Sequence, residues 1–255
     1  MIKLKTKAEI ETMKVGGARH AEILRELAKQ VAPGVSTMIL EEEAQRMIRE
    51  RGDKPAFLGY QPAGAKRPYP AALCVSINDE IVHGIPNEAE RIINQGDIVS
   101  LDLGLIHGGL ITDGAITVPV GAIDDEDKEL LKVTKRALEA GIKEAKPGNT
   151  VGDISQAIMD VVNKSKFSLA EDLAGHGVGY KVHEDPFIPN IGYSGDGEKL
   201  VAGMVIAIEP MVNVGKPQIK LANDGYTIKT RDGSRSAHFE HTVAITEKGN
   251  IVLTQ

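Results

Sequence analysis

The chain has 255 residues, of which 42% are hydrophobic and 26% charged, which suits one large soluble domain or two closely packed halves. Its net charge of -6, with no long basic run, argues against nucleic-acid binding. No apolar run approaches the ~20 residues of a membrane span or forms a signal-peptide core, and Cys74 is the single cysteine. A reducing, cytoplasmic location is therefore expected.

The first part of the chain predicts two helices followed by short strands. Apolar residues at helical spacing predict a helix over residues 7–31, which ends at Pro33-Gly34. Ser36 or Thr37 can cap a second helix over residues 38–51. Residues 55–71 are rich in glycine and proline and are expected to form a surface loop. Strands are predicted at residues 72–77, near 81–82, and at 97–105.

The second part of the chain repeats this plan. A long helix is predicted over residues 124–146, and a short helix follows it. The segment 146–151 echoes 32–37 at an offset of 114, and 203–209 echoes 96–102 at an offset of 107. We therefore expect one domain over residues 1–255, built from halves of about 1–120 and 121–255 around a central cleft.

Asp102 and Asp113 lie on two predicted strands, residues 100–106 and 110–118, that a short turn joins. If His107-Gly108 forms the turn, Asp102 faces Asp113 directly, whereas a Gly108-Gly109 turn makes them diagonal neighbours on one face. Two carboxylates at about 4 Å repel each other by roughly 4 kcal/mol at an effective dielectric constant near 20. The alternative interpretation is a pair of solvated carboxylates on an edge hairpin.

Five ionisable residues in or beside apolar, strand-like runs carry the functional prediction: Asp102, Asp113, His176, Glu209 and Glu240. Burying a carboxylate without a partner costs several kcal/mol or forces its neutralisation. Two divalent cations would balance the four carboxylates, and a neutral histidine would fill a remaining position. The pattern therefore predicts a hydrolytic site with two metal ions.

Several short motifs follow one another along the whole chain: Phe57-Leu-Gly-Tyr60, Cys74-Val-Ser-Ile-Asn78, Val82-His-Gly-Ile-Pro86, Gly96 to Asp102, Thr112-Asp113, Gly175-His-Gly-Val-Gly179, His183-Glu-Asp-Pro186, Ile208-Glu-Pro-Met211 and Phe239-Glu-His-Thr242. Taken in this order, they resemble those of type I methionine aminopeptidases of the short, bacterial kind. The resemblance implies the α+β pita-bread fold, in which two pseudo-symmetric halves form a curved antiparallel sheet backed by helices. The short interval from Glu209 to Glu240 leaves no room for the helical insertion of type II enzymes. No zinc-finger extension is expected before the catalytic domain.

The resemblance also implies a role for each ligand. Asp102 would be a bidentate ligand of one ion, and Asp113 and Glu240 would bridge the two ions. His176 and Glu209 would complete the second position. Oxygen ligands with one imidazole suit Co, Mn, Fe or Zn, so the ligand types leave the ion open.

Two further histidines match catalytic positions of the family. His183 would hydrogen-bond the scissile carbonyl and its developing oxyanion, and His83 would contact the substrate amide nitrogen. Glu209 would act as a proton shuttle as well as a ligand, with a metal-bridging hydroxide as nucleophile. No role is assigned to the remaining histidines, His20, His107, His238 and His241; His241 should face away from the site because it alternates with Glu240.

The resemblance places an apolar methionine pocket beside these groups, with walls from Phe57, Tyr60, Tyr69, Cys74, Val182 and Tyr226. The chain departs from the common bacterial pattern at this pocket. The segment 61–67 makes the loop between Tyr60 and Cys74 longer, Tyr226 stands where tryptophan is frequent, and Val182 stands where an aromatic residue is frequent. We therefore expect altered tolerance for substrate side chains and inhibitors, with the chemistry unchanged.

The function implied is removal of the initiator methionine from nascent proteins and peptides, with a preference for a small second residue. The partners would be nascent polypeptide N-termini, with room for a transient ribosome association. A monomer is expected, without membrane binding or nucleic-acid specificity. The alternatives are an X-Pro dipeptidase or aminopeptidase P, which usually carry an N-terminal domain, and a non-catalytic protein that binds peptides or partners on the same scaffold.

Overall fold

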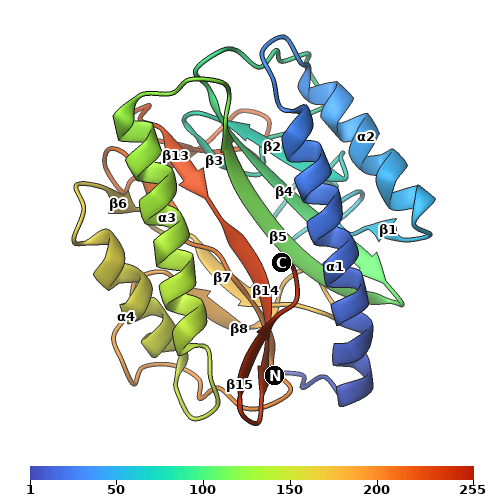
Figure 1. The fold of residues 1–255 in the computed structure, drawn as a ribbon, viewed down its shortest axis with the longest axis vertical. Coiled ribbons are helices and arrows are strands. Elements are labelled where there is room, and N and C mark those ends of the chain that lie inside the picture. Colours follow the sequence, from blue (N-terminus) through green and yellow to red (C-terminus); the bar gives the residue numbers. More distant parts are fainter.

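Four helices lie on one side of a curved antiparallel sheet in the computed structural model, which describes residues 1–255 (Figure 1). The helices are α1 (Lys7–Gln30), α2 (Thr37–Glu50), α3 (Asp125–Glu144) and α4 (Val151–Val162). Their bounds lie close to the predicted ones, so the predicted helices are confirmed. None of the four combines the length and the apolar character that a membrane span requires.

Each helix begins at a residue whose side chain can accept hydrogen bonds from the first helical turn. Thr6 and Glu9 form a capping box before α1, and Thr150 and Asp153 form another before α4. Ser36 accepts from the backbone of the first turn of α2, and Asp124 does the same for α3. Such caps typically stabilise a helix by ~1 kcal/mol each, which explains why the helix starts were readable from the sequence.

The main sheet has nine strands, all antiparallel to their neighbours. Its continuous order is β1 (Lys54–Pro55), β4 (Ile98–His107), β5 (Leu110–Pro119), β14 (Glu240–Thr246), β9 (Val205–Ile208), β7 (Ala174–Gly177) and β8 (Glu184–Pro189), with β2 (Leu73–Ile77) also on β4 and β15 (Gly249–Val252) also on β14. The central pairing, β5 with β14, joins residues 114–115 to residues 240–241.

The strands on the two sides of this central pairing follow the same plan. The order β2–β4–β5 on one side corresponds to β7–β9–β14 on the other, with β5 and β14 meeting in the middle. The starts of α2 and α4 also correspond, because Ser36 forms an isolated β-bridge with Ile92 and Thr150 forms one with Lys199. The two sides of the sheet thus place equivalent strands around one centre.

Two small sheets extend the central strands at one end of the molecule. One contains β13 (Ser236–His238), β10 (Met211–Asn213) and β6 (Ser168–Leu169). The other contains β11 (Ile219–Leu221), β12 (Ile228–Thr230) and β3 (Glu80–Val82). Both are antiparallel, and they supply loops and strand ends to the concave side of the main sheet.

The hairpin of β4 and β5 decides between the two turns considered above. His107 pairs with Leu110, so Gly108 and Gly109 form the turn. Asp102 pairs with Ala115 and Asp113 pairs with Gly104. The two aspartates are therefore diagonal neighbours on one face. Gly108 and Gly109 both have positive φ values, +56° and +82°, a conformation that glycine adopts without strain.

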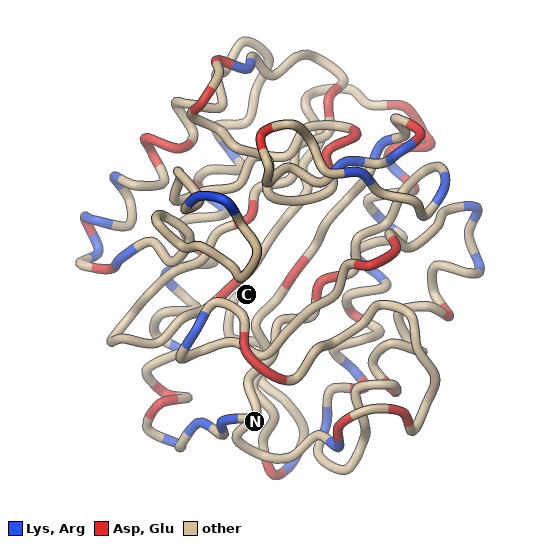
Figure 2. The backbone as a smooth tube through the Cα atoms, turned by 180° about the vertical axis from the view of Figure 1, so that it is seen from behind, with Lys and Arg blue, Asp and Glu red and all other residues tan.

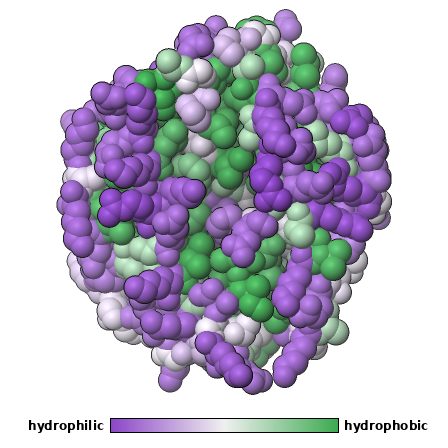
Figure 3. Space-filling view, viewed as in Figure 1, coloured by the Kyte–Doolittle hydropathy of each residue, from purple (hydrophilic) through white to green (hydrophobic).

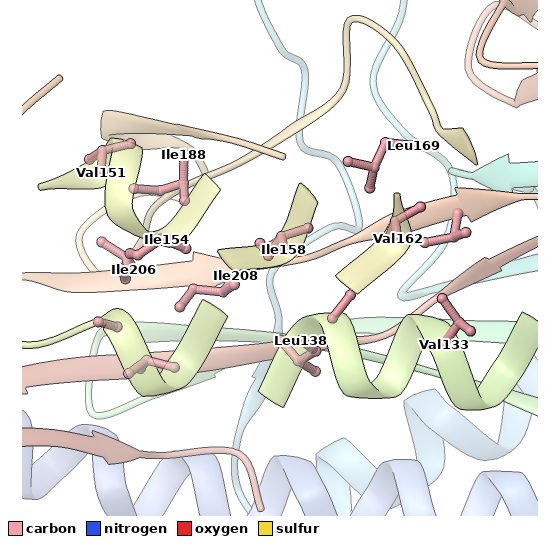
Figure 4. Close-up of a cluster of buried hydrophobic side chains, with 14 of the residues drawn as sticks. Val133, Leu138, Val151, Ile154, Ile158, Val162, Leu169, Ile188, Ile206 and Ile208 are labelled. Atoms are coloured by element: carbon pink, nitrogen blue, oxygen red, sulfur yellow. The ribbon is translucent and has the colours of Figure 1, made fainter. Parts of the chain in front are cut away.

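The hydrophobic core lies between the helices and the sheet. One cluster joins α3 and α4 to β8 and β9, and it contains Val133, Leu138, Ile154, Ile206 and Ile208 (Figure 4). A second cluster packs α1 and α2 against β2 and β4. Viewed from the helix side, the surface is hydrophilic over the outer helices, with hydrophobic residues between them (Figure 3). The helices thus leave the opposite, concave side of the sheet free for a site.

The segment 55–71 differs in part from the expected surface loop. Phe57, Tyr69 and Ala71 are buried. The Tyr69 hydroxyl donates to the carbonyl oxygen of Gly84 at 3.0 Å, which ties the loop to the segment after β3. Glycine and proline in this segment correctly indicated irregular backbone, but its aromatic side chains pack inward.

Candidate metal centre

The concave side of the sheet holds a cavity of about 140 Å³ near the middle of the molecule. Seen from this side, acidic segments lie on central strands, and most of the lysine and arginine lies nearer the edge (Figure 2). All five predicted ligands and both predicted catalytic histidines line the cavity. Ten of its 18 lining residues are hydrophobic, so the cavity combines a charged part with an apolar part.

Strand register brings the five predicted ligands together. Asp102 lies within β4, Asp113 within β5, and His176 within β7. Glu240 is the first residue of β14, and Glu209 directly follows β9. The five residues are far apart in the sequence but lie on strands that are neighbours at the centre of the sheet.

A threonine on β14 fixes the backbone at Asp113. The Thr242 hydroxyl accepts from the Asp113 N–H at 2.8 Å and donates to the Asp113 carbonyl oxygen at 2.7 Å. The Asp113 carboxylate also accepts from the Gly114 N–H at 3.0 Å. These bonds hold one candidate ligand rigidly between the two halves of the sheet.

The ligand atoms form two overlapping groups. Asp113, His176 and Glu240 present atoms within 4.8 Å of one another, and so do Glu209, His238 and Glu240. Asp102 lines the same cavity but belongs to neither group of three. Glu240 is common to both groups.

His176 has the protonation pattern of a metal ligand. Its Nδ1 lies 2.9 Å from the carbonyl oxygen of Gly177, so Nδ1 carries the hydrogen. Its Nε2 lone pair then faces Glu209 Oε1 at 3.4 Å and Asp113 Oδ2 at 3.9 Å. A backbone carbonyl that fixes the tautomer in this way is typical of metal-binding histidines.

Burial without countercharge dominates the electrostatics of the centre. It raises the pKa of Asp102 to about 7, and it raises the pKa values of Asp113, Glu209 and Glu240 well above their usual range, aided by the charges of neighbouring carboxylates. Burial also lowers the pKa of His176 to about 3. The protein alone therefore supplies no positive charge to neutralise four carboxylates.

The residues present fit divalent metal ions. Asp102 Oδ1 and Glu240 Oε1 are buried and have no hydrogen-bond partner, which is costly unless a cation satisfies them. Donor atoms bound at about 2.1 Å to one ion lie roughly 3.0–3.4 Å apart, close to the separation of His176 Nε2 and Glu209 Oε1. Carboxylate oxygens with imidazole suit first-row divalent ions.

The two predicted catalytic histidines line the cavity beside the candidate ligands. His183 Nδ1 lies 2.9 Å from the Tyr60 hydroxyl, and its ring packs edge-on against the His176 ring, with 4.4 Å between centroids. His83 has a positive φ of 61°, an uncommon backbone conformation that often marks a functional site. Burial lowers the pKa of His83 to about 4, which keeps its imidazole neutral.

The apolar part of the cavity contains all six residues assigned to the methionine pocket: Phe57, Tyr60, Tyr69, Cys74, Val182 and Tyr226. Tyr69 and Tyr226 meet edge to face, with 5.2 Å between ring centroids. Burial raises the pKa of the Cys74 thiol well above its usual range, so Cys74 is a buried thiol without nucleophilic character. Val82, Leu173 and Met211 line the same space and were not identified from the sequence.

The longer loop is attached to the pocket wall through Arg67. The Tyr226 hydroxyl donates to the Arg67 carbonyl oxygen, and the Arg67 guanidinium lies 5.8 Å from the centre of the Tyr226 ring. The same guanidinium pairs with Glu88 and donates to the Asp224 carbonyl oxygen at 3.1 Å. The inserted residues 61–67 and the segment 224–226 therefore hold each other in place.

His238 is an ionisable residue of the centre to which the sequence analysis assigned no role. It lies at the end of β13 and reaches the carboxylates of Glu209 and Glu240. A signal existed, because residues two apart on an extended chain share a face and His238 is two residues before Glu240. The same alternation predicted that His241 faces away from the site. His241 contacts Thr254 instead of the cavity.

Comparison with known protein families agrees with this centre. Residues 11–247 match the model of metallopeptidase family M24. The chain is 49% identical to a methionine aminopeptidase of Aquifex aeolicus, with 100% of this chain and 99% of the relative covered. It is 45% identical to methionine aminopeptidase 1 of Bacillus subtilis, with both chains covered in full.

Solved structures of related proteins have the same fold. A methionine aminopeptidase from Thermotoga maritima superposes with a TM-score of 0.95 at 45% identity, and both chains are covered in full. A prolidase from Pyrococcus furiosus superposes with a TM-score of 0.77 at 22% identity, covering 99% of this chain and 65% of the prolidase. The first likeness extends to sequence and fold, whereas the second is one of fold alone.

Proposed function

The chain belongs to metallopeptidase family M24, and we propose that it uses two divalent metal ions to remove the initiator methionine from nascent proteins and peptides. Relatives that are 40–49% identical over its full length are methionine aminopeptidases, so removal of N-terminal methionine is its activity. The pita-bread fold implied by the sequence is confirmed. A preference for a small second residue is part of the proposal.

One observation carries the two-metal proposal. Asp113, His176, Glu209 and Glu240 converge on one buried cavity with unpaired oxygen atoms and no balancing cationic side chain. Asp102 and the bridging Asp113 and Glu240 would hold one ion, and His176 and Glu209 would complete the second position. Co, Mn, Fe or Zn suits these donors.

When bound, such ions supply Lewis acidity and lower the pKa of a coordinated water. The side chains of the chain supply the remaining functions. Glu209 takes the proton of the attacking water and passes it to the departing amine. His183, held by Tyr60, donates a hydrogen bond to the carbonyl oxygen as negative charge develops there. His83 orients the substrate amide nitrogen.

The apolar part of the cavity receives the methionine side chain. Its walls, Phe57, Tyr60, Tyr69, Cys74, Val182 and Tyr226, line the same cavity as the candidate ligands, so a side chain in the pocket would present its first peptide bond to the metal centre. A free α-amino group would be held by the carboxylates and ions, which excludes blocked N-termini. Binding and chemistry are thus adjacent within one cavity.

We propose that residues 1–255 act as one catalytic domain whose halves, about 1–120 and 121–255, each contribute ligands. The substrates would be nascent polypeptide N-termini in the cytoplasm. The protein would act as a monomer that associates transiently with ribosomes. The alternative function is that of a proline-specific dipeptidase. The chain resembles such enzymes in fold alone.

The test is peptide cleavage by metal-stripped protein with Mn, Fe, Co or Zn added back. The panel contains Met-Ala-Ser, Met-Lys-Ser, N-formyl-Met-Ala-Ser and Ala-Pro. Metal-dependent release of methionine from Met-Ala-Ser alone is the expected result. Cleavage of Ala-Pro instead would favour the proline-specific alternative, and cleavage with no metal present would refute the metal-dependent mechanism.

A further inference from the structure

His238 is a buried imidazole that the mechanism above does not use. Its side chain is 1% exposed. Nε2 lies 3.6 Å from Glu209 Oε2 and 3.7 Å from Glu240 Oε2. Neither ring nitrogen has a hydrogen-bond partner. Burying an imidazole without hydrogen bonds costs free energy, so its position between two candidate ligands indicates a function.

The backbone of His238 is fixed in the same way as that of Asp113. The Thr117 hydroxyl donates to the His238 carbonyl oxygen at 2.7 Å and accepts from the His238 N–H at 2.8 Å. Thr117 lies on β5, so the strand that carries Asp113 also positions His238. The imidazole is thus held by the same framework as the candidate metal ligands.

Glu209 lies between two histidines with different surroundings. Its Oε1 faces the Nε2 of His176, whose hydrogen is on Nδ1. Its Oε2 faces the Nε2 of His238. In His238, Nδ1 has no acceptor and Nε2 points at two carboxylates, so the hydrogen belongs on Nε2. One oxygen of Glu209 therefore faces a lone pair and the other faces a donor.

We propose that His238 is a positioning residue whose Nε2–H binds the Oε2 side of Glu209 and the adjacent carboxylate of Glu240, so that Oε1 of Glu209 is presented to a metal ion beside His176. This inference rests on the proposed function only in that the cluster holds metal ions. The present separations exceed a hydrogen bond by a few tenths of an ångström, which a small side-chain movement closes. Outer partners of this kind commonly change metal affinity by about 10–100-fold.

The experiment is a calorimetric titration of metal-free protein with Co(II) alone. His238→Leu fills the space without a donor, and His238→Gln restores an N–H donor. The matched control is His241→Gln, since His241 is near in sequence but contacts Thr254 Oγ1 at 3.0 Å. We expect His238→Leu to weaken Co(II) binding by about 10–100-fold, and we expect His238→Gln and His241→Gln to stay within about threefold of the unchanged protein.

A purely structural role for His238 predicts a different pattern. It would make metal-free His238→Leu less heat-stable without changing its Co(II) affinity, whereas the positioning role predicts a loss of Co(II) affinity that His238→Gln restores. Unchanged Co(II) affinity in His238→Leu would overturn the inference and leave the peptidase function standing. Equal losses of Co(II) affinity in His238→Leu and His238→Gln would also overturn it, because an N–H donor at this position would then not restore metal binding. Absence of Co(II) binding by the unchanged protein would overturn both proposals.

Discussion

The candidate metal centre and the proposed methionine pocket share one cavity but are built differently. The candidate ligands lie on or directly beside strands paired at the middle of the main sheet, where register fixes each side chain. Much of the pocket wall comes from the segments 57–74 and 224–226, which side-chain contacts hold together. In the proposed function, chemistry therefore depends on backbone pairing between strands, whereas selectivity depends on loops that can change without disturbing that pairing.

The largest expected effect comes from breaking the centre itself. Asp113→Asn removes one charge from the candidate bridge while keeping the Gly114 contact possible, so metal loading should fall and kcat/KM should drop by at least about 100-fold. Metal content by mass spectrometry, measured beside peptide cleavage, checks this. Asp125→Asn, an exposed carboxylate at the start of α3, is the control. Normal metal content in Asp113→Asn would contradict its assignment as a ligand.

A second substitution separates chemistry from metal binding inside the centre. His183→Ala removes the proposed donor to the carbonyl oxygen but none of the proposed ligands, so turnover should fall by about 10²–10³-fold with metal content unchanged. Stopped assays with Met-Ala-Ser and metal analysis on the same samples make the measurement. Unchanged kcat/KM would sink the oxyanion role.

The buried ionisable groups of the centre should make the stability of metal-free protein depend on pH. The buried carboxylates have raised pKa values, so the folded state keeps protons that the unfolded state loses above about pH 4. Stability from this source is present at low pH and is lost as pH rises. The buried histidines have lowered pKa values, so their contribution is lost as pH falls below about 6.5.

The two contributions oppose each other below pH 6.5, and only the carboxylate contribution acts above it. We therefore expect metal-free protein to lose on the order of 1 kcal/mol or more of unfolding free energy between pH 6.5 and pH 8. Urea unfolding across this range measures it. Saturation with Co(II) should remove or reverse the decline, because metal binding favours the deprotonated ligands. A metal-free protein that gains stability over this range would contradict the uncompensated burial.

The smallest effect should come from loosening the pocket. Arg67→Ala removes the contacts to Glu88 and Asp224 but touches no candidate ligand, so KM should rise by about three- to tenfold with kcat nearly unchanged. Steady-state kinetics with Met-Ala-Ser and Met-Lys-Ser check this, and Lys66→Ala is the exposed neighbouring control. A matching loss of kcat would mean that the loop affects the chemistry as well.

Sequence reasoning worked best where local rules apply. The start of the second helix was readable from Ser36 or Thr37 because N-caps are local signals. Carboxylates in apolar strands indicated a charged centre, because burying an unpaired charge costs free energy in any protein. The turn of the β4–β5 hairpin could not be fixed, because both His107-Gly108 and Gly108-Gly109 are acceptable two-residue turns and only the pairing in the whole sheet decides.

Sequence reasoning was weaker where side chains meet across distant loops. Nothing local to Arg67 predicts that it packs on Tyr226 or pairs with Glu88, since these contacts depend on how two loops fold together. The composition of the segment 55–71 suggested a surface loop, and only the family resemblance placed the buried Phe57 and Tyr69 in a pocket wall. His238 was assigned no role although alternation along the chain placed it on the same side as Glu240.

The pairing of β5 with β14 also has a consequence for the order of folding. Asp102 and Asp113 lie on one hairpin, which can form early because its contacts are local. Glu240 reaches them only after residues 114–115 pair with residues 240–241, which closes a loop of about half the chain. A nascent chain whose last strands have not yet emerged therefore holds an incomplete set of ligands, and acquisition of metal would mark the completion of synthesis and folding.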